Sequence, residues 1–159
     1  MKRESNGFSL IELLIVVAII LIIAAIAIPN LLKSRIAANQ ASAVGSLRTL
    51  NTSEATYSST YPTGYSPDLV SLGPGAGGTG SPASAGMVDS VLAAGTKSGY
   101  SFTYATTVSA SGRYDTYTIN ANPATVGTTG TNYYFTDQSG VIRQNSSQAA
   151  AATDSPIGG

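Results

Sequence analysis

Glu12 is the residue that most suggests a chemical role, because it lies inside an apolar run that extends from Phe8 to Ile28. An ionisable group within such a span costs about 2.5 to 3.5 kcal/mol on membrane-insertion scales, so it normally has a partner or a function. Cleavage after Gly7 would create an α-amino group on Phe8, and a cationic amine beside a carboxylate in a low-dielectric environment is a favourable pair. Alternatively, Glu12 merely occupies the first turn of a helix, where the helix dipole favours negative charge, or lies near lipid headgroups.

The remaining composition argues against most enzyme chemistry. The chain has His 0 and Cys 0, so it lacks the commonest general base, the commonest nucleophile–base pairs and the usual zinc ligands. We therefore expect no catalysis, no cofactor and no metal. The loop at Asp137 offers one carboxylate, whereas calcium prefers six to eight oxygen ligands, so a plain turn is the favoured interpretation there.

The charge distribution makes nucleic acid an unexpected partner. The formal net charge is +0, and the eight basic residues are scattered along the chain. Electrostatic attraction to a phosphate backbone would therefore be weak. Two short patterns typical of N-glycosylation begin at Asn51 and Asn145, but such patterns often arise by chance.

The apolar run is long enough to cross a bilayer as a helix, since roughly 20 residues at about 1.5 Å each match a hydrocarbon core of roughly 30 Å. It follows a short polar segment, residues 1–7, that contains Lys2 and Arg3. No small-residue cleavage site follows the run, so we expect the mature protein to retain it. A plain N-terminal membrane anchor is the alternative that hydropathy alone leaves open.

The residues G-F-S-L-I-E from Gly7 to Glu12, with the basic leader before them and the apolar run after them, closely resemble the signal of type IV prepilins and pseudopilins. In that family a prepilin peptidase cuts after the glycine and N-methylates the new first residue. The resemblance therefore implies leader cleavage between Gly7 and Phe8, and N-methylation of Phe8. It also implies that Glu12 forms a salt bridge with the N-terminal amine of a neighbouring subunit and so sets the register of assembly.

Pro29 follows the apolar run, and its effect on a helix can be predicted from its chemistry. It has no N–H to donate to the carbonyl of Ala25, and its ring crowds that carbonyl, so we expect a kink or local opening there. In related pili a proline at this place accompanies local unwinding of the helix. A proline that marks the membrane boundary is a compatible reading.

Beyond Pro29, apolar residues spaced by three, four or seven predict an amphipathic helix that ends near Ser58 to Tyr61, before Pro62. Polar and aromatic residues then alternate in two segments, Tyr100 to Ala105 and Tyr117 to Ala121, which predicts strands joined by a turn at Ser109 to Gly112. A second hairpin is expected to join Tyr133–Thr136 to Val141–Gln144. The predicted fold class is α+β and type IV pilin-like, with a long N-terminal α-helix packed on a small four-stranded antiparallel β-sheet.

The expected organisation has six parts. They are a leader at 1–7, a transmembrane and filament-core segment at 8–28, an amphipathic stalk at 29–61, a Gly/Pro/Ser-rich connection with a short helix at 62–99, a sheet at 100–145 and a flexible tail at 146–159. The short helix in the connection is expected at MVDSVLAAG, capped by Asp89 or a neighbouring residue and stopped by Gly95.

These expectations lead to a structural subunit of a type IV pilus, a homo-oligomeric helical filament. Prepilin peptidase and a pilus or secretion assembly machinery would be its partners. The precursor would cross the bacterial inner membrane once, and the mature chain would reach an extracellular pilus. The alternatives are the major pseudopilin of a type II secretion system, in a periplasmic pseudopilus, and a membrane-tethered binding module that keeps its leader and does not polymerise.

Overall fold

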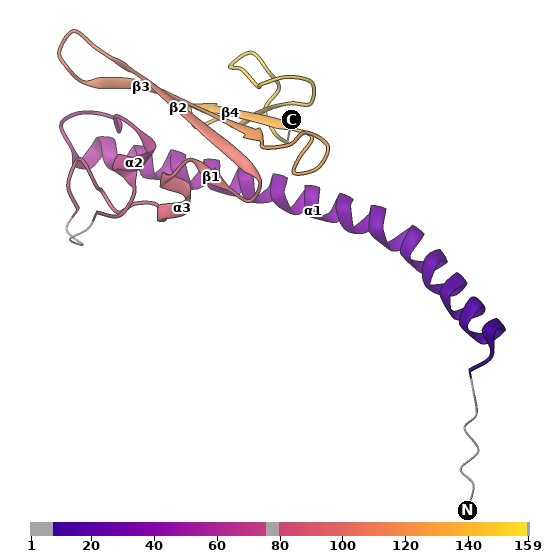
Figure 1. The fold of residues 1–159 in the computed structure, drawn as a ribbon. Helices are drawn as coiled ribbons and strands as arrows, with labels where there is room; N and C mark the ends of the chain where they lie inside the picture. Colours follow the sequence, from indigo (N-terminus) through magenta and orange to yellow (C-terminus); the bar gives the residue numbers. More distant parts are fainter. Residues whose placement is uncertain (1–7, 76–79, 159) are drawn as a thin grey trace, which may run out of the picture. The chain divides into compact units, whose positions relative to one another are not determined.

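The computed structural model describes residues 8–75 and 80–158 of the 159-residue chain. Within these residues the α+β class is confirmed (Figure 1). The elements, in chain order, are α1 (Leu10–Thr60), α2 (Leu69–Leu72), α3 (Ser90–Ala93), β1 (Thr96–Lys97), β2 (Tyr100–Val108), β3 (Tyr114–Pro123), β4 (Tyr133–Asp137) and β5 (Arg143–Asn145). The chain divides into two compact units, Met1–Arg35 and Ile36–Gly159, which we call the N-terminal and the C-terminal unit.

The part of α1 in the C-terminal unit is amphipathic, as the sequence predicts. Its buried apolar side chains recur at Ala43, Leu47, Leu50 and Tyr57. The last three have no exposed surface (0% each), and the full burial of a leucine side chain contributes about 1.5 to 3 kcal/mol relative to leaving it in water. The helix ends at Thr60, where the residues before Pro62 predict its end.

The sheet has five strands rather than the four expected, in the order β1-β2-β3-β4-β5, and every neighbouring pair is antiparallel. The extra strand is β1, which pairs Lys97 with Tyr100 across a two-residue loop of Ser98 and Gly99. Both loop residues have positive φ, 50° and 72°, as tight hairpin turns require. A strand of two residues shows no alternation along the sequence, so periodicity could not reveal it.

Both predicted hairpins are present. β2 and β3 are joined through a turn in which Gly112 N donates to Ser109 O at 2.9 Å. β4 and β5 are joined through a turn in which Gly140 N donates to Asp137 O, also at 2.9 Å. The second strand of that hairpin begins at Arg143 instead of Val141.

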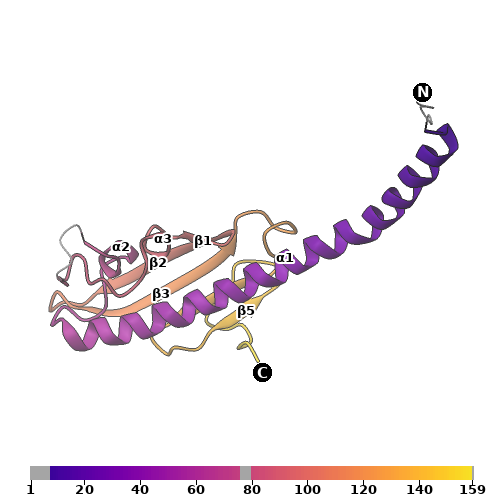
Figure 2. The same ribbon diagram turned by 90° about the horizontal axis from the view of Figure 1, so that it is seen from below.

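The inner face of the sheet packs on α1 to form the core of the C-terminal unit. Tyr100 and Phe102 of β2 and Tyr117, Ile119 and Ala121 of β3 are buried and belong to one cluster with the buried residues of α1. Figure 2 shows this part of α1 running along the sheet, close to β3. The alternation of aromatic and polar residues thus places the tyrosines mainly in packing positions.

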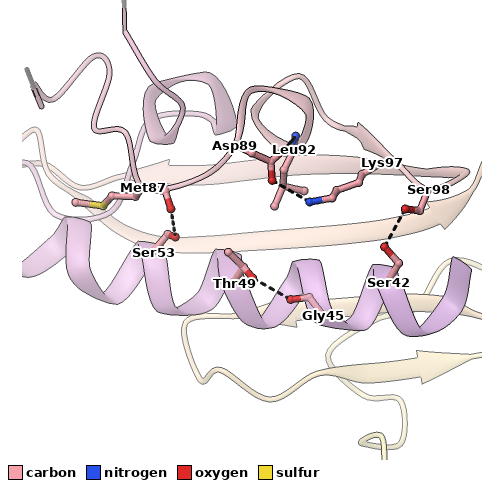
Figure 3. A network of polar contacts seen from close by, with 9 residues as sticks. All are labelled: Ser42, Gly45, Thr49, Ser53, Met87, Asp89, Leu92, Lys97 and Ser98. Carbon is pink, nitrogen blue, oxygen red and sulfur yellow. Dashed lines mark hydrogen bonds and ion pairs between the residues drawn. The ribbon is translucent and has the colours of Figure 1, made fainter. Parts of the chain in front are cut away.

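The connection between α1 and the sheet contains two short helices, one more than expected. Asp68 caps α2 by accepting from Ser71 N at 2.8 Å, and Leu72 at its end is fully buried. Asp89 caps α3 by accepting from Leu92 N at 2.9 Å, as predicted, and its other oxygen accepts from Lys97 Nζ at 2.8 Å (Figure 3).

Side-chain hydrogen bonds join this connection to α1. Ser53 Oγ donates to Met87 O at 3.3 Å, and Ser42 Oγ donates to Ser98 Oγ at 2.9 Å (Figure 3). The two contacts lie before and after α3 in the sequence, so the α3 region is fastened to the helix on both sides.

Residues 146–158, expected as a flexible tail, make polar contacts with the sheet. Asn120 Nδ2 donates to Ala150 O at 2.8 Å, and Ala150 is only 4% exposed. Ile157 N donates to Ile142 O at 2.9 Å. The tail makes these contacts through its backbone groups. Every residue has such groups, so a segment of small and polar residues shows no apolar pattern that would predict them.

Candidate processing and assembly site

The start of α1 forms half of a capping box. Leu13 N donates to Ser9 O at 3.2 Å, so Ser9 occupies the capping position. The backbone N–H of Ser9 also donates to Glu12 Oε2 at 2.9 Å. A Ser followed three residues later by a Glu that returns to the capping N–H is the pattern that begins many helices. Glu12 therefore does stabilise the first helical turn, as the simpler reading of the sequence proposed.

That contact leaves the other carboxylate oxygen available. Among the described residues, Glu12 Oε1 has no hydrogen-bond partner, and Glu12 forms no salt bridge. Phe8 lies close to it in sequence and is 78% exposed. Gly7 lies outside the described residues, so the predicted cleavage and the methylation of Phe8 remain predictions.

The apolar side chains of the N-terminal unit have no protein partners. From Phe8 to Leu31 the large aliphatic and aromatic side chains are 46% to 81% exposed, around the whole helix. Leaving apolar surface in water costs about 25 cal/mol per Å². Within the described residues, α1 is the one helix long and apolar enough to cross a membrane, and it lies near the N-terminus.

Pro29 lies inside α1, and the helix is assigned without interruption through it. The missing N–H still leaves one fewer hydrogen bond at this point. The kink or local opening expected at Pro29 stays a prediction.

A buried carboxylate that the sequence reasoning missed lies near the end of α1. Glu54 is 0% exposed, its Oε2 accepts from Ser66 N at 2.9 Å and its Oε1 accepts from Ser66 Oγ at 2.5 Å. Burial raises the pKa of the Glu54 carboxyl above its ordinary value, and the two hydrogen bonds from Ser66 oppose this only in part. The sequence did hold a signal, since Glu54 continues the spacing of Leu47, Leu50 and Tyr57 on the buried face.

The two glycosylation patterns fall on asparagines whose amides are already engaged. Asn51 Nδ2 donates to Thr136 Oγ1 at 2.9 Å and to Gly140 O at 3.1 Å. Asn145 Nδ2 donates to Asp154 Oδ1 at 3.0 Å. A sugar on Asn51 would displace contacts between α1 and the β4–β5 hairpin, and a sugar on Asn145 would displace a contact between β5 and the C-terminal segment.

The Asp137 loop is a turn stabilised by its own side chain. Asp137 Oδ1 accepts from Ser139 N at 2.9 Å and from the Ser139 hydroxyl. An aspartate that bonds the backbone two residues ahead is a common turn-forming contact. No group of three or more acidic or histidine side chains suited to a metal occurs in the described part of the chain.

Comparison with known proteins relates this segment to pilins. Residues 2–28 match the family described as the prokaryotic N-terminal methylation motif. The chain is 65% identical over 37 residues to the type IV wide pilus major component PilA4 of Thermus thermophilus, a match that covers 23% of this chain and 28% of that protein. It is 49% identical over 54 residues to the type IV major pilin protein PilA of Myxococcus xanthus, covering 34% of this chain and 24% of that protein.

The matched segment thus spans about a quarter of each relative's own length. No solved structure matches the chain significantly. The fold is type IV pilin-like. It has a prepilin-type N-terminal motif on a long helix, and an antiparallel sheet packs on that helix. Over residues 2–28 the chain carries the prokaryotic N-terminal methylation motif, and its N-terminal segment is similar to the N-terminal segments of these two type IV pilins.

Proposed function

We propose that the chain is a structural subunit of a type IV pilus filament. The observation that carries this proposal is the combination, in the N-terminal unit, of an apolar helix whose large side chains are 46% to 81% exposed with a single carboxylate near its start. Such a surface is stable only in lipid or against other apolar helices. The two pilin relatives are named as major pilus components, which favours this function for a chain that shares their N-terminal segment.

The first step would be processing at the inner membrane. Prepilin peptidase would hydrolyse the Gly7–Phe8 peptide bond and a methyl group would be added to the freed amine of Phe8. The precursor would be held by the apolar segment until then, with the C-terminal unit outside the cytoplasm. Glu12, placed five residues into the mature chain, would then lie near this new positive charge or that of another subunit.

Assembly would exchange lipid contacts for contacts between helices. Glu12 Oε1, which has no partner among the described residues, would accept from the N-terminal amine of a neighbouring subunit while Oε2 keeps its bond to Ser9. The same contact repeated between successive copies is heterologous and does not close, so it generates a helical polymer. Pro29 would allow α1 to open locally as the helices pack.

Filament preparations from the producing organism test this function. Surface filaments sheared from the cells should contain this chain as their main component, and deletion of its gene should remove them. If the filaments persist unchanged, the chain is not their structural subunit. The two alternatives give other results. If the chain is a pseudopilin, deletion of its gene should leave surface filaments intact and block protein export. If it is a tethered binding module, the chain should be found as a monomer in the membrane.

A further inference from the structure

The C-terminal unit contains a carboxylic acid in an environment that has no counter-charge. Glu54 is 0% exposed, and within the described residues it forms no ion pair. Burying a carboxylate without a cation is costly, whereas the neutral acid is tolerated when it is hydrogen-bonded. The carboxyl group therefore gains from carrying a proton.

The groups that face Glu54 are hydroxyls from three directions. Ser66, also 0% exposed, contacts it from the start of the connection, and Tyr104 reaches the same point from β2 through Ser66. Tyr57 on α1 and Tyr117 on β3 lie near enough for the Glu54 charge to raise the pKa of each, after the larger effect of burial. Asp68 and Asp137 add further negative charge near these two tyrosines.

The hydrogen-bond geometry is consistent with a neutral Glu54. The acid would donate to Ser66 Oγ at 2.5 Å, Ser66 Oγ to the Tyr104 hydroxyl at 3.2 Å, and that hydroxyl to Ser66 O at 2.8 Å. Every hydroxyl hydrogen then has an acceptor. When Glu54 is ionised, Ser66 Oγ donates to it, and the one hydrogen of the Tyr104 hydroxyl can serve either Ser66 O or Ser66 Oγ, so one of these two contacts loses its hydrogen.

We propose that Glu54, Ser66 and Tyr104 form a proton-dependent latch, which holds the start of the connection against α1 and β2 when Glu54 is neutral and weakens when Glu54 is ionised. The three groups come from α1, from the chain just after it and from β2, so the latch joins segments that are 12 and 38 residues apart. It is a property of the single chain and does not depend on filament assembly.

The direction of the pH effect follows from linkage. The folded-state pKa of Glu54 is raised above its unfolded value, so its stabilising effect is complete below the ordinary glutamate pKa and is lost as pH rises through the folded-state pKa. Burial raises the pKa of Tyr104 and Tyr117 as well, so these groups stay neutral in mildly alkaline solution. A loss of stability between acid and mildly alkaline pH would then not come from these two tyrosines.

The test is thermal unfolding of the full chain in detergent, followed by the near-ultraviolet circular dichroism of its tyrosines, from mildly acidic to mildly alkaline pH. The wild-type Tm should fall as pH rises. Glu54→Gln mimics the neutral acid, because its amide can donate to Ser66 Oγ and accept from Ser66 N, so its Tm should stay nearly constant. Asp115→Asn, in an exposed pair with Arg113, is the matched control and should keep the wild-type pH dependence. Equal pH dependence in wild type and Glu54→Gln would overturn the proposal.

A second measurement follows the protonation of Glu54 directly and tests the latch even if Glu54→Gln does not fold. The sequence contains three glutamates, Glu4, Glu12 and Glu54, so the carboxyl carbons of a ¹³C-glutamate-labelled chain give a simple spectrum. Glu4→Gln and Glu12→Gln assign the remaining signal to Glu54 by elimination. That signal should titrate above the ordinary glutamate range, and a Glu54 signal that titrates within or below it would overturn the latch.

Discussion

The backbone nitrogen of Ser9 lies 2.9 Å from Oε2 of Glu12, and this contact closes the first turn of α1. The carboxylate therefore has a local role that needs no second subunit. Its other oxygen is unengaged within the described residues, so a cap and an intermolecular ion pair are compatible on the same side chain. The cap depends on an oxygen atom and the ion pair on a charge, which allows the two roles to be separated by mutation.

Glu12→Gln should separate them. The glutamine keeps an oxygen for the Ser9 N–H, so helix α1 should still begin at Leu10 and leader cleavage should remain largely intact. The negative charge is lost, and breaking a buried ion pair costs about 3 to 5 kcal/mol, or roughly 100-fold or more in an equilibrium constant. We expect the yield of sheared filaments, normalised to processed chain, to fall by about that factor.

Ser9→Ala is the matched control for this experiment, because the contact uses the Ser9 backbone N–H, which alanine retains. Its filament yield should stay close to wild type. A wild-type yield from Glu12→Gln would refute the proposed pairing with a neighbouring subunit.

Leu50→Ala should test the packing of α1 on the sheet. Leu50 is 0% exposed and lies in the main cluster of the C-terminal unit, and such truncations lower the free energy of unfolding by about 2 to 5 kcal/mol. Urea unfolding of the full chain in detergent, followed by tyrosine fluorescence, measures this. Val91→Ala removes a side chain that is 55% exposed and should change the stability by less than about 0.5 kcal/mol. Similar losses for the two variants would mean that this interface is not the core.

Substitutions of Asp89 should distinguish its cap from its ion pair. Asp89→Ala removes the acceptor for Leu92 N and should cost about 1 kcal/mol, whereas Asp89→Asn keeps a capping oxygen and loses only the exposed pair with Lys97. Asparagine should therefore be nearly neutral in the same unfolding experiment. A larger loss for asparagine than for alanine would show that the charge, and not the cap, stabilises α3.

Local signals account for much of what the sequence predicts correctly. Three correct predictions depend on residues close together in the chain. They are the buried face of α1, the end of α1 before Pro62, and the two hairpin turns at Gly112 and Gly140. The cap at Asp89 is equally local. Such features follow from side-chain periodicity and from the few residues that favour a turn or a cap.

The features that the sequence did not reveal are either very short or depend on contacts between distant residues. Strand β1 has only two residues, which pair with β2 across the turn at Ser98 and Gly99, and helix α2 buries Leu72 in a segment dominated by Gly, Pro and Ser. The buried position of Glu54 requires Ser66 and Tyr104 to meet it from other elements. Acidic residues usually lie at the surface. The burial of Glu54 could therefore be predicted only by giving its helical spacing from Leu47, Leu50 and Tyr57 more weight than its charge.

The same contrast applies to the candidate site. The apolar run, Glu12 and the glycine before Phe8 are visible in the sequence as a motif, and the match over residues 2–28 rests on that motif. The capping contact of Ser9 with Glu12 could have been read from the S-x-x-E spacing, which begins at Ser9.

The mass of the mature N-terminus tests the central claim most directly. The chain should be taken from sheared filaments of the producing organism and its N-terminal peptide measured by mass spectrometry. The account predicts a peptide that begins at Phe8 with one added methyl group, without residues 1–7. A filament chain that still begins at Met1, or that begins at Phe8 without the added methyl group, would contradict it.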